Sequence, residues 1–464
     1  MQYHADGSAV ARVWAALALV AATGFGATEP ALAADHRVSP GSSTFECNSV
    51  KPGDTVTIAS GTRGPLRIRN CNGTASNRIV IRNDPNGNGP AVIRQTSGTS
   101  GFVFNCNNCV GVDIDGSYKW KGAPGGKTYG IEVTVTGGGG PTAFLMVGGL
   151  SRFVTIRNVE IDGKWPAIAK DGNGIVVHDK AIKRSKYPSL WREGILIEDN
   201  YIHDVDGEGM YIGANYSAGE LPLRNVEIRY NRVEDTGWEG INTKSMWSGN
   251  NTIHHNVVRR AGKKTSSTSE KEQYAGIKNN AGAVKIYNNW VEATGQHGIE
   301  VWSQQGPKTS EGRGPFEAHI WNNVIVDAGK LWRSFMGTSY GINVGAQSGV
   351  EKPIPYIYNN TIVNARQRSI NVSSTAGGGR VNDNIVAGTG SNPIISVPGF
   401  VQLSNNFVGS ISQVGFVNAS GLDFRLTVNS PALNKGSSNH PPSDYTDARR
   451  PKEGGPDQGA YEGR

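Results

Sequence analysis

Short runs of alternating apolar and polar residues recur along the chain from about residue 154 onward. In each run, β-branched or aliphatic residues alternate with polar ones over three to five positions, and an asparagine closes the run. A period of two is typical of a β-strand that buries one face. Seven copies share this pattern, and they span residues 196–202, 226–233, 252–258, 284–291, 319–325, 356–362 and 381–386.

The spacing of the closing asparagines indicates how these strands are arranged. Successive copies lie 31, 25, 33, 34, 37 and 24 residues apart, so a core repeat of about two dozen residues is lengthened by insertions of different size. Strands this short, separated by Asn and Gly, leave no room for helical crossovers. Parallel stacking of successive repeats then buries the alternating apolar face. The repeat therefore predicts a parallel β-helix.

The closing asparagines have a mechanical interpretation. A small polar residue tolerates a left-handed corner, and amide side chains stacked on successive repeats can hydrogen-bond to one another. We therefore expect a ladder of structural, not catalytic, asparagines. They are Asn200, Asn231, Asn256, Asn289, Asn323, Asn360 and Asn384.

Both ends of the chain resemble a known group of proteins. Residues 50–62 read Val-Lys-Pro-Gly-Asp-Thr-Val-Thr-Ile-Ala-Ser-Gly-Thr and residues 79–82 read Ile-Val-Ile-Arg, while residues 430–433 read Ser-Pro-Ala-Leu and residues 457–462 read Asp-Gln-Gly-Ala-Tyr-Glu. These phrases resemble the opening and closing phrases of pectate-lyase-like carbohydrate-active proteins. The resemblance implies an all-β fold, the single-stranded right-handed parallel β-helix (solenoid), on which lyases, hydrolases, epimerases and adhesins occur.

A second strand in each repeat begins with a Gly-aliphatic pair, which allows five repeats to be superposed. Alternation turns the aliphatic residue of each pair inward and leaves three rows of outward side chains, whose neighbours should lie about 4.8 Å apart. Row 1 contains Glu208, Glu239, Ala275, His297 and Tyr340; row 2 contains Tyr211, Asn242, Lys278, Glu300 and Asn343; row 3 contains Gly213, Lys244, Asn280, Trp302 and Gly345.

The insertions border this polar surface on both sides. Four of them (180–193, 213–222, 303–316 and 346–353) leave from the far end of the strand, and two (262–274 and 329–339) enter at its near end. Long loops on a rigid scaffold commonly carry binding, so we expect a groove. Basic and aromatic side chains suit the carboxylates and rings of sugars. The expected substrate-binding residues are Asn242, Asn280, Glu300, Trp302, Arg184, Lys186, Trp191 and Arg192.

The N-terminus predicts export. An apolar stretch over residues 13–25 follows Arg12 and leads to a small-x-small site at residues 31–33, which is typical of a secretory signal. No other stretch approaches the roughly 20 apolar residues of a membrane span. We expect a signal peptide over residues 1–34, a β-helix with a cysteine-containing cap over 35–420, and an irregular tail over 421–464 that packs on the helix end. The mature protein should be a secreted or periplasmic monomer.

Charge and cysteine content agree with this interpretation. The formal net charge is +7, and removal of residues 1–34 raises it to +8 because Asp6 and Glu29 leave with Arg12. A basic exported protein suits an acidic polysaccharide, whereas no basic helix or recognition motif favours nucleic acid. In an oxidising compartment four cysteines predict disulfides. They are Cys47, Cys71, Cys106 and Cys109.

The outward rows carry side chains suited to β-elimination of a uronate. This reaction needs a base for the C5 proton, a proton donor for the leaving oxygen, and donors or positive charge facing the carboxylate. Lys244 is the first candidate for the base and Lys278 the second, because a lysine beside other cations or in a closed groove can become a usable base. His297 and Tyr211 are further candidates for proton transfer.

Residues 239–245, Glu-Gly-Ile-Asn-Thr-Lys-Ser, with Asn251 following, resemble the catalytic strand of polysaccharide lyase family 6, which includes chondroitinase B and alginate lyases. The resemblance implies that Lys244 is the base and that Glu208 and Glu239 hold calcium. Gly237 stands where that family has a second acidic ligand, and the family's catalytic arginine has no clear counterpart here.

Three other functions are compatible with the same residues. A uronan C5-epimerase begins with the same proton abstraction, and paired carboxylates can hydrolyse glycosides. A carbohydrate-binding or surface-attachment solenoid would need no catalysis at all. The sequence nevertheless favours an exported polysaccharide lyase.

Overall fold

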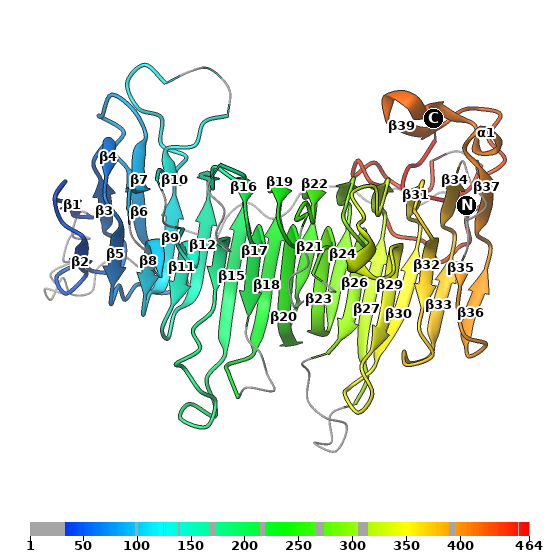
Figure 1. Cartoon of the computed structure of the whole chain (residues 1–464), viewed down its shortest axis with the longest axis horizontal. Coiled ribbons are helices and arrows are strands. Elements are labelled where there is room, and N and C mark those ends of the chain that lie inside the picture. Colours follow the sequence, from blue (N-terminus) through cyan, green and yellow to red (C-terminus); the bar gives the residue numbers. More distant parts are fainter. Residues whose placement is uncertain are drawn as a thin grey trace, which may run out of the picture. The chain divides into compact units, whose positions relative to one another are not determined.

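The computed structural model describes residues 33–97, 101–123, 125, 127–137, 140–167, 172–213, 219–265, 273–304, 314–388, 395–452 and 454–463. The predicted signal peptide lies almost entirely outside these residues. From Ala34 onward the chain forms one compact unit. This unit consists of short strands that stack rung upon rung (Figure 1).

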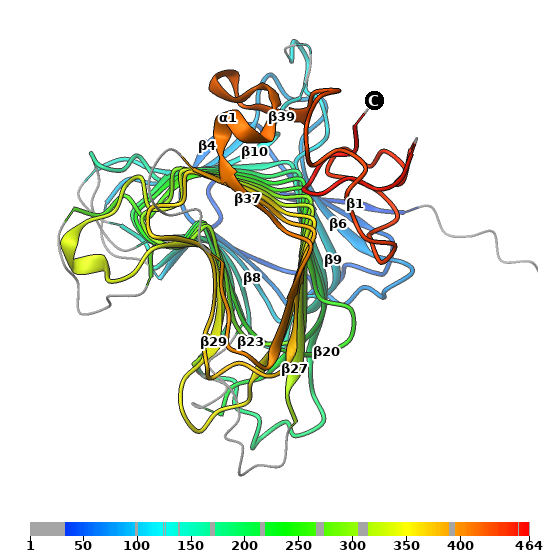
Figure 2. The same cartoon turned by 90° about the vertical axis from the view of Figure 1, so that its right-hand side faces the viewer.

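Each complete rung contributes one strand to each of three faces, and strands on the same face pair in parallel with the rungs before and after them. Viewed along the stack, the faces surround one core (Figure 2). Face 1 contains β1 (Asp35–Val38), β3 (Thr55–Ile58), β6 (Ile79–Asn83), β9 (Val110–Asp115), β12 (Arg152–Arg157), β15 (Arg192–Glu198), β18 (Leu223–Arg229), β21 (Thr252–His254), β24 (Val284–Tyr287), β27 (Phe316–Trp321), β30 (Pro353–Tyr358), β33 (Gly379–Asn382) and β36 (Val401–Ser404).

Face 2 contains β2 (Thr44–Glu46), β5 (Leu66–Arg69), β8 (Phe102–Asn107), β11 (Ala143–Gly148), β14 (Asn173–Val177), β17 (Met210–Gly213), β20 (Ile241–Ser248), β23 (Ile277–Gly282), β26 (Ile299–Ser303), β29 (Tyr340–Ala346), β32 (Arg368–Val372) and β35 (Ile395–Ser396). Face 3 contains β4 (Gly61–Arg63), β7 (Ala91–Gln95), β10 (Ile131–Val135), β13 (Val159–Asp162), β16 (Tyr201–Val205), β19 (Arg232–Thr236), β22 (Val257–Ala261), β25 (Trp290–Glu292), β28 (Val324–Val326), β31 (Thr361–Val363), β34 (Ile385–Gly388) and β37 (Phe407–Ser410).

The predicted asparagine ladder is confirmed at the corner between faces 1 and 3. Each side-chain amide donates to the Oδ1 of the next asparagine at 2.9–3.0 Å, from Asn200 through Asn384, and Asn406 extends the series by one rung. The expected left-handed corner is displaced by one position. The residue before each ladder asparagine has the positive φ, for example Tyr230 at 54° and Asn288 at 52°. The ladder residue itself thereby turns inward, where its amide satisfies buried backbone groups.

Disulfides confirm the expected oxidation state of the four cysteines. Cys47 pairs with Cys71 across 24 residues, and Cys106 pairs with Cys109 at a turn. Cys47 follows β2 and Cys71 follows β5, so the first of these bonds joins two consecutive rungs near the N-terminal end of the stack, where the core has no preceding rung.

Beyond β37 the chain forms α1 (Ile411–Val414), β38 (Phe416–Asn418), the 3₁₀ turn η4 (Ala419–Gly421) and β39 (Asp423–Leu426), after which it follows an irregular path. Phe424 and Tyr461 pack in a separate apolar cluster with Trp290 and Val324 of face 3. In the part of the chain that the structure describes, no helix is long and apolar enough to cross a membrane.

The ladder makes a direct prediction about stability. Asn289 donates to the carbonyls of Ile253 and Tyr287 and to Asn323, and its Oδ1 accepts from the backbone and side chain of Asn256. We expect Asn289→Ala to lower the free energy of unfolding by about 2–4 kcal/mol, because it leaves buried partners unsatisfied. Asn250→Ala, at an exposed position, is the control. Equal unfolding midpoints in urea for the two variants would contradict this role.

Candidate active site

The register of face 2 places the polar rows as the sequence predicts. Tyr211 pairs with Asn242, Asn242 with Lys278, Lys278 with Glu300, and Glu300 with Asn343. In the next row Gly213 pairs with Lys244 and Lys244 with Asn280. The intervening aliphatic residues point into the core. Row 2 is therefore a continuous line of side chains along the outside of face 2, and in row 3 Lys244 lies beside Asn280.

A bend before each strand brings row 1 to the same surface. Strict alternation would give Glu208 the inward direction of Met210, but Gly209 and Met210 both face the core. A Cβ on Gly209 would lie 2.4 Å from Val233, and one on Gly240 would lie 2.4 Å from Val258. Only glycine fits this close approach. The bend turns the preceding glutamates outward, where Glu208 Oε1 accepts from Asn242 Nδ2 at 3.4 Å.

Lys278 sits between two buried carboxylates. Its Nζ lies 3.0 Å from Glu300 Oε2 and 3.6 Å from Glu239 Oε1. Glu300 also accepts from Asn343 Nδ2 at 3.0 Å and lies 3.4 Å from His297 Nε2. Burial alone would raise the pKa of Glu300, but Lys278, His297 and these hydrogen bonds outweigh it and lower the pKa. Lys278 therefore compensates buried charge and is a poor candidate for a base.

His297 is held in place as well. Its Nδ1 accepts from the backbone N–H of Tyr340 at 3.1 Å, and its ring stacks on that of Tyr340 with centroids 5.2 Å apart. Burial lowers the pKa of His297; Glu300 opposes this shift, and the nearby Lys278 adds to it. The neutral imidazole therefore has Nδ1 against the backbone of Tyr340 and Nε2 beside Glu300, and it holds the Glu300 side chain in position.

Lys244 has a different environment from Lys278. Its Nζ donates to Tyr211 Oη at 3.1 Å and lies 4.3 Å from the centre of the tyrosine ring. No carboxylate among the described residues forms an ion pair with it. Burial raises the pKa of Tyr211, although Lys244 opposes part of that effect, so the phenol keeps its proton. The structure thus brings together two of the predicted catalytic residues as a hydrogen-bonded pair.

His178 belongs to the same site, and the sequence interpretation missed it. It directly follows β14 and lies beside Tyr211, with ring centroids 5.5 Å apart. Burial lowers its pKa to about 4, and Arg192, Lys180 and Lys244 add to this shift against the opposing Glu220. The phrase Asn173-Gly-Ile175 repeats the Gly-aliphatic signal, and extending the alignment to it places His178 in row 3.

The acidic end of the rows has the chemistry of a cation site. Burial raises the pKa of Glu239 to about 8; nearby Glu208 adds to this shift, while Lys278 opposes it. Both carboxylate oxygens of Glu239 and Oδ1 of Asn242 are buried and have no hydrogen-bond partner among the described residues, although Lys278 Nζ lies 3.6 Å from Glu239 Oε1. Hard cations such as calcium prefer oxygen donors of this kind. Glu208, Glu239 and Asn242 therefore fit such an ion better than the two glutamates alone.

A cavity of about 510 Å³ continues the groove toward the C-terminal rungs. Trp302 lies across Gly345, where a Cβ would come within 2.5 Å of the indole. Arg368 lines the same cavity, lies over the ring of Tyr340 and donates to Asn371 Oδ1 at 2.6 Å. The sequence alignment stopped one rung short of Arg368 because its strand lacks the Gly-aliphatic pair.

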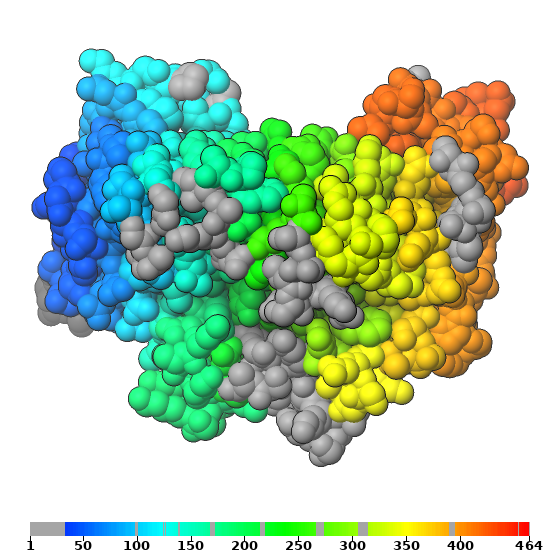
Figure 3. Space-filling view, in the orientation of Figure 1, coloured from blue at the N-terminus to red at the C-terminus, as the bar shows by residue number. Residues whose placement is uncertain are grey.

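Loops border face 2 on two sides (Figure 2). The insertion at 329–339 contains the 3₁₀ turn η3 (Ser334–Met336), and its Gly337 and Thr338 line the cavity. In the space-filling view the surface is hollowed between this projection and the loop at 346–353 below it, both in yellow (Figure 3). Residues 214–218, 266–272 and 305–313 of the other predicted insertions lie outside the described residues.

The basic loop between β14 and β15 requires one correction. Arg192, predicted to bind substrate, is only 2% exposed and donates to the carbonyl of Gly149 at 2.8 Å. It begins β15 and anchors the loop, so it does not face the groove. Lys186 is exposed, and Arg184 and Trp191 are half-buried, so contact between these three residues and a substrate stays a prediction.

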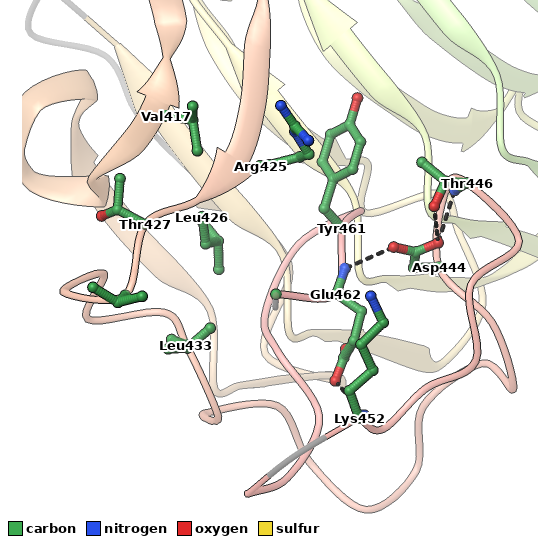
Figure 4. Close-up of a pocket in the computed structure, with 12 residues that line it drawn as sticks. Val417, Arg425, Leu426, Thr427, Leu433, Asp444, Thr446, Lys452, Tyr461 and Glu462 are labelled. Atoms are coloured by element: carbon green, nitrogen blue, oxygen red, sulfur yellow. Dashed lines mark hydrogen bonds between the residues drawn. The ribbon is translucent and has the colours of Figure 1, made fainter.

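Two further features lie elsewhere. Asp162, His203 and Asp204 lie on face 3, with ligand atoms within 4.8 Å of one another. Among the described residues, this is the one group of three potential metal ligands that lie this close together. A hollow of about 540 Å³ lies in the C-terminal segment (Figure 4). There Asp444 accepts from the backbone of Thr446 and Glu462, which indicates a structural role.

Comparison with known proteins agrees with this geometry. Residues 142–313 match the family model described as "Right handed beta helix region". The fold is a right-handed parallel β-helix. The pectate lyase Pel9A superposes with a TM-score of 0.50 at 14% identity, covering 90% of this chain and 89% of that one.

Two other solved structures show weaker likeness. An alginate lyase from Paenibacillus sp. str. FPU-7 has a TM-score of 0.43 at 14% identity, covering 81% of this chain and 99% of its own. A lacto-N-biosidase from Eubacterium ramulus has a TM-score of 0.45 at 11% identity, covering 78% and 63%. No curated protein shows significant sequence similarity. The family model and the superposition on Pel9A show the fold and leave the reaction to be argued from the site.

The compensating role of Lys278 can be tested by removing its charge. We expect Lys278→Met to destabilise the protein by about 3–5 kcal/mol, because Glu239 and Glu300 lose their buried cation. Lys285→Met, at an exposed position on β24, is the matched control. An unchanged melting temperature for Lys278→Met would contradict this role.

His178 predicts a loss of stability in acid. Its pKa is about 4 in the folded chain and near 6.5 when unfolded, so between these values only the unfolded chain takes up the proton. Stability attributable to His178 is therefore present above pH 6.5 and falls toward pH 4. We expect His178→Asn to remove about 1–3 kcal/mol of this acid-side loss, measured by urea unfolding at pH 7 and pH 4.5. His319→Asn, half-exposed on face 1, is the control; a parallel pH dependence in wild type and His178→Asn would refute the assignment.

Proposed function

We propose that this protein is an exported polysaccharide lyase that cleaves a uronate-containing polysaccharide by β-elimination, with Lys244 as base and Tyr211 as acid. The observation that carries the proposal is the 3.1 Å hydrogen bond between Lys244 Nζ and Tyr211 Oη in a groove on face 2. An amine and a neutral phenol at this distance provide both proton transfers that the reaction needs.

The reaction proceeds by two proton transfers around one bond cleavage. Lys244 Nζ takes the C5 proton of the uronate, and the C–H electron pair forms the C4–C5 double bond. The C4–O bond breaks, and the leaving oxygen takes the proton of Tyr211. The Lys244 ammonium then returns its proton to the tyrosinate across their hydrogen bond. The pair is restored without an outside acid.

The uronate carboxylate must be neutralised while charge develops on it. Asn242 precedes Lys244 by two residues on the same strand, and Asn280 lies beside Lys244 on the next rung; both can donate amide N–H groups toward the carboxylate. Glu208, Glu239 and Asn242 would hold a calcium ion beside them. When bound, such an ion would supply positive charge to the carboxylate.

The remaining groove suits an extended anionic chain. Trp302 and Tyr340 offer aromatic surface for sugar rings, and Arg368 has no carboxylate partner in an ion pair among the described residues. Arg184, Lys186 and Trp191 on the loop after β14 would extend this contact at the other end. The predicted signal peptide and the two disulfides support action outside the cytoplasm.

Substitution of the pair tests this mechanism. We expect Lys244→Ala and Tyr211→Phe each to reduce kcat about 10²- to 10⁴-fold, since each removes one proton-transfer group. The assay is ultraviolet absorbance of the unsaturated uronate produced from alginate, pectate, chondroitin sulfate, dermatan sulfate and glucuronan. Lys285→Ala, on face 1, should retain wild-type activity.

The product separates the lyase from its alternatives. New reducing ends without ultraviolet absorbance would indicate hydrolysis, and altered C5 configuration in an uncut chain would indicate epimerisation. Full lyase activity in Lys244→Ala would exclude the proposed base.

A further inference from the structure

We infer that the elimination is syn, so that the substrate carries its C5 hydrogen and its C4 oxygen on the same face of the sugar ring. The substrate class is then D-mannuronate or D-glucuronate, rather than D-galacturonate, L-guluronate or L-iduronate. This inference rests on the proposed function and adds the configuration of the sugar that is cut.

The distance within the catalytic pair carries the argument. Lys244 Nζ and Tyr211 Oη are 3.1 Å apart. A reacting atom must approach its catalytic group to about 3–3.5 Å. Groups that act on opposite faces of one ring must therefore be at least about 6 Å apart. Two atoms in a direct hydrogen bond can reach the ring only from one side.

The architecture of the site gives the same constraint. Tyr211 and Lys244 both project outward from neighbouring strands of face 2, in adjacent rows. Of the titratable side chains near the pair, His178, Lys278 and Glu300 belong to the same rows or follow the same strands. Glu220 comes from the insertion at 213–222 and lies 3.6 Å from His178 Nδ1. Lys278 and Glu300 are also engaged with each other at 3.0 Å. The described residues of the rows thus approach a bound sugar from a single side.

Sugar stereochemistry converts this geometry into a substrate class. In D-mannuronate and D-glucuronate the C5 hydrogen and the C4 oxygen lie on the same face of the ring, so the amine can take the proton while the adjacent phenol protonates the leaving oxygen. In D-galacturonate the C4 oxygen lies on the opposite face. In L-guluronate and L-iduronate it is the C5 hydrogen that lies on the opposite face from the C4 oxygen. Those three sugars would need a second proton-transfer group across the ring.

Four homopolymers test the inference directly. Polymannuronate, β-1,4-glucuronan, polyguluronate and polygalacturonate are compared with the full mature protein in the presence of calcium. We expect kcat/KM on polymannuronate or glucuronan to exceed that on both other polymers by at least tenfold. Faster cleavage of polyguluronate or polygalacturonate would overturn the syn assignment and leave the lyase proposal standing. Absence of unsaturated product from all four polymers and from chondroitin and dermatan sulfates would instead refute the lyase proposal itself.

A variant separates the two proton transfers. In Tyr211→Phe the amine can still remove the C5 proton, but the leaving oxygen has no donor. In D₂O we expect deuterium to enter C5 of uncut polymannuronate or glucuronan, whichever wild type cleaves, while cleavage falls at least 100-fold. Tyr356→Phe, on face 1, should cleave as wild type does. Unchanged cleavage by Tyr211→Phe would show that the acid lies elsewhere and would overturn the inference.

Discussion

The structure depends above all on the parallel register of its rungs. Short strands stacked in parallel have no hairpins to set their alignment, and a slip of one residue would turn every core side chain outward. The asparagine ladder opposes such a slip, because each amide bonds to the next asparagine and to carbonyls of two rungs. Since the ladder is buried, a slip would leave polar groups unsatisfied at every corner. The alignment of Tyr211, Asn242, Lys278 and Glu300 is a consequence of this constraint.

Given this register, the properties of the site depend on which charged side chains lie beside one another on face 2. Side chains on adjacent rungs lie close enough that like charges repel and unlike charges neutralise one another. Lys278 is enclosed by Glu239 and Glu300, whereas Lys244 contacts only a neutral phenol among the polar groups that the structure describes near it. Two lysines one rung apart therefore have different capacities. One compensates buried charge, and the other is available to a substrate.

Much of this could be predicted from sequence because it repeats. The period of two, the closing asparagines and the Gly-aliphatic pairs together specify the faces and the rows, and the structure confirms both. Residues outside the repeat were harder to place. Arg192 was assigned to the groove by the composition of its loop, yet it begins a strand and is buried. Arg368 escaped the alignment because its strand has no glycine.

The sequence does not show which side chains of neighbouring repeats contact each other. The order of side chains in a row can be read from the chain, but the direction in which a lysine bends cannot. That choice makes Lys278 a partner of two glutamates and Lys244 a partner of Tyr211. The bend at Gly209 and Gly240 likewise depends on Val233 and Val258 of face 3, which lie outside the Gly-aliphatic phrases from which the rows were predicted.

The most direct measurement is a crystal structure of the Tyr211→Phe variant with a bound tetrasaccharide of the polymer that the wild type cleaves. The account predicts a uronate in the groove of face 2, with its C5 carbon about 3–3.5 Å from Lys244 Nζ and its C4 oxygen beside the ring of residue 211. A sugar bound with its C5 carbon remote from Lys244, or bound on another face, would contradict the assignment of this site.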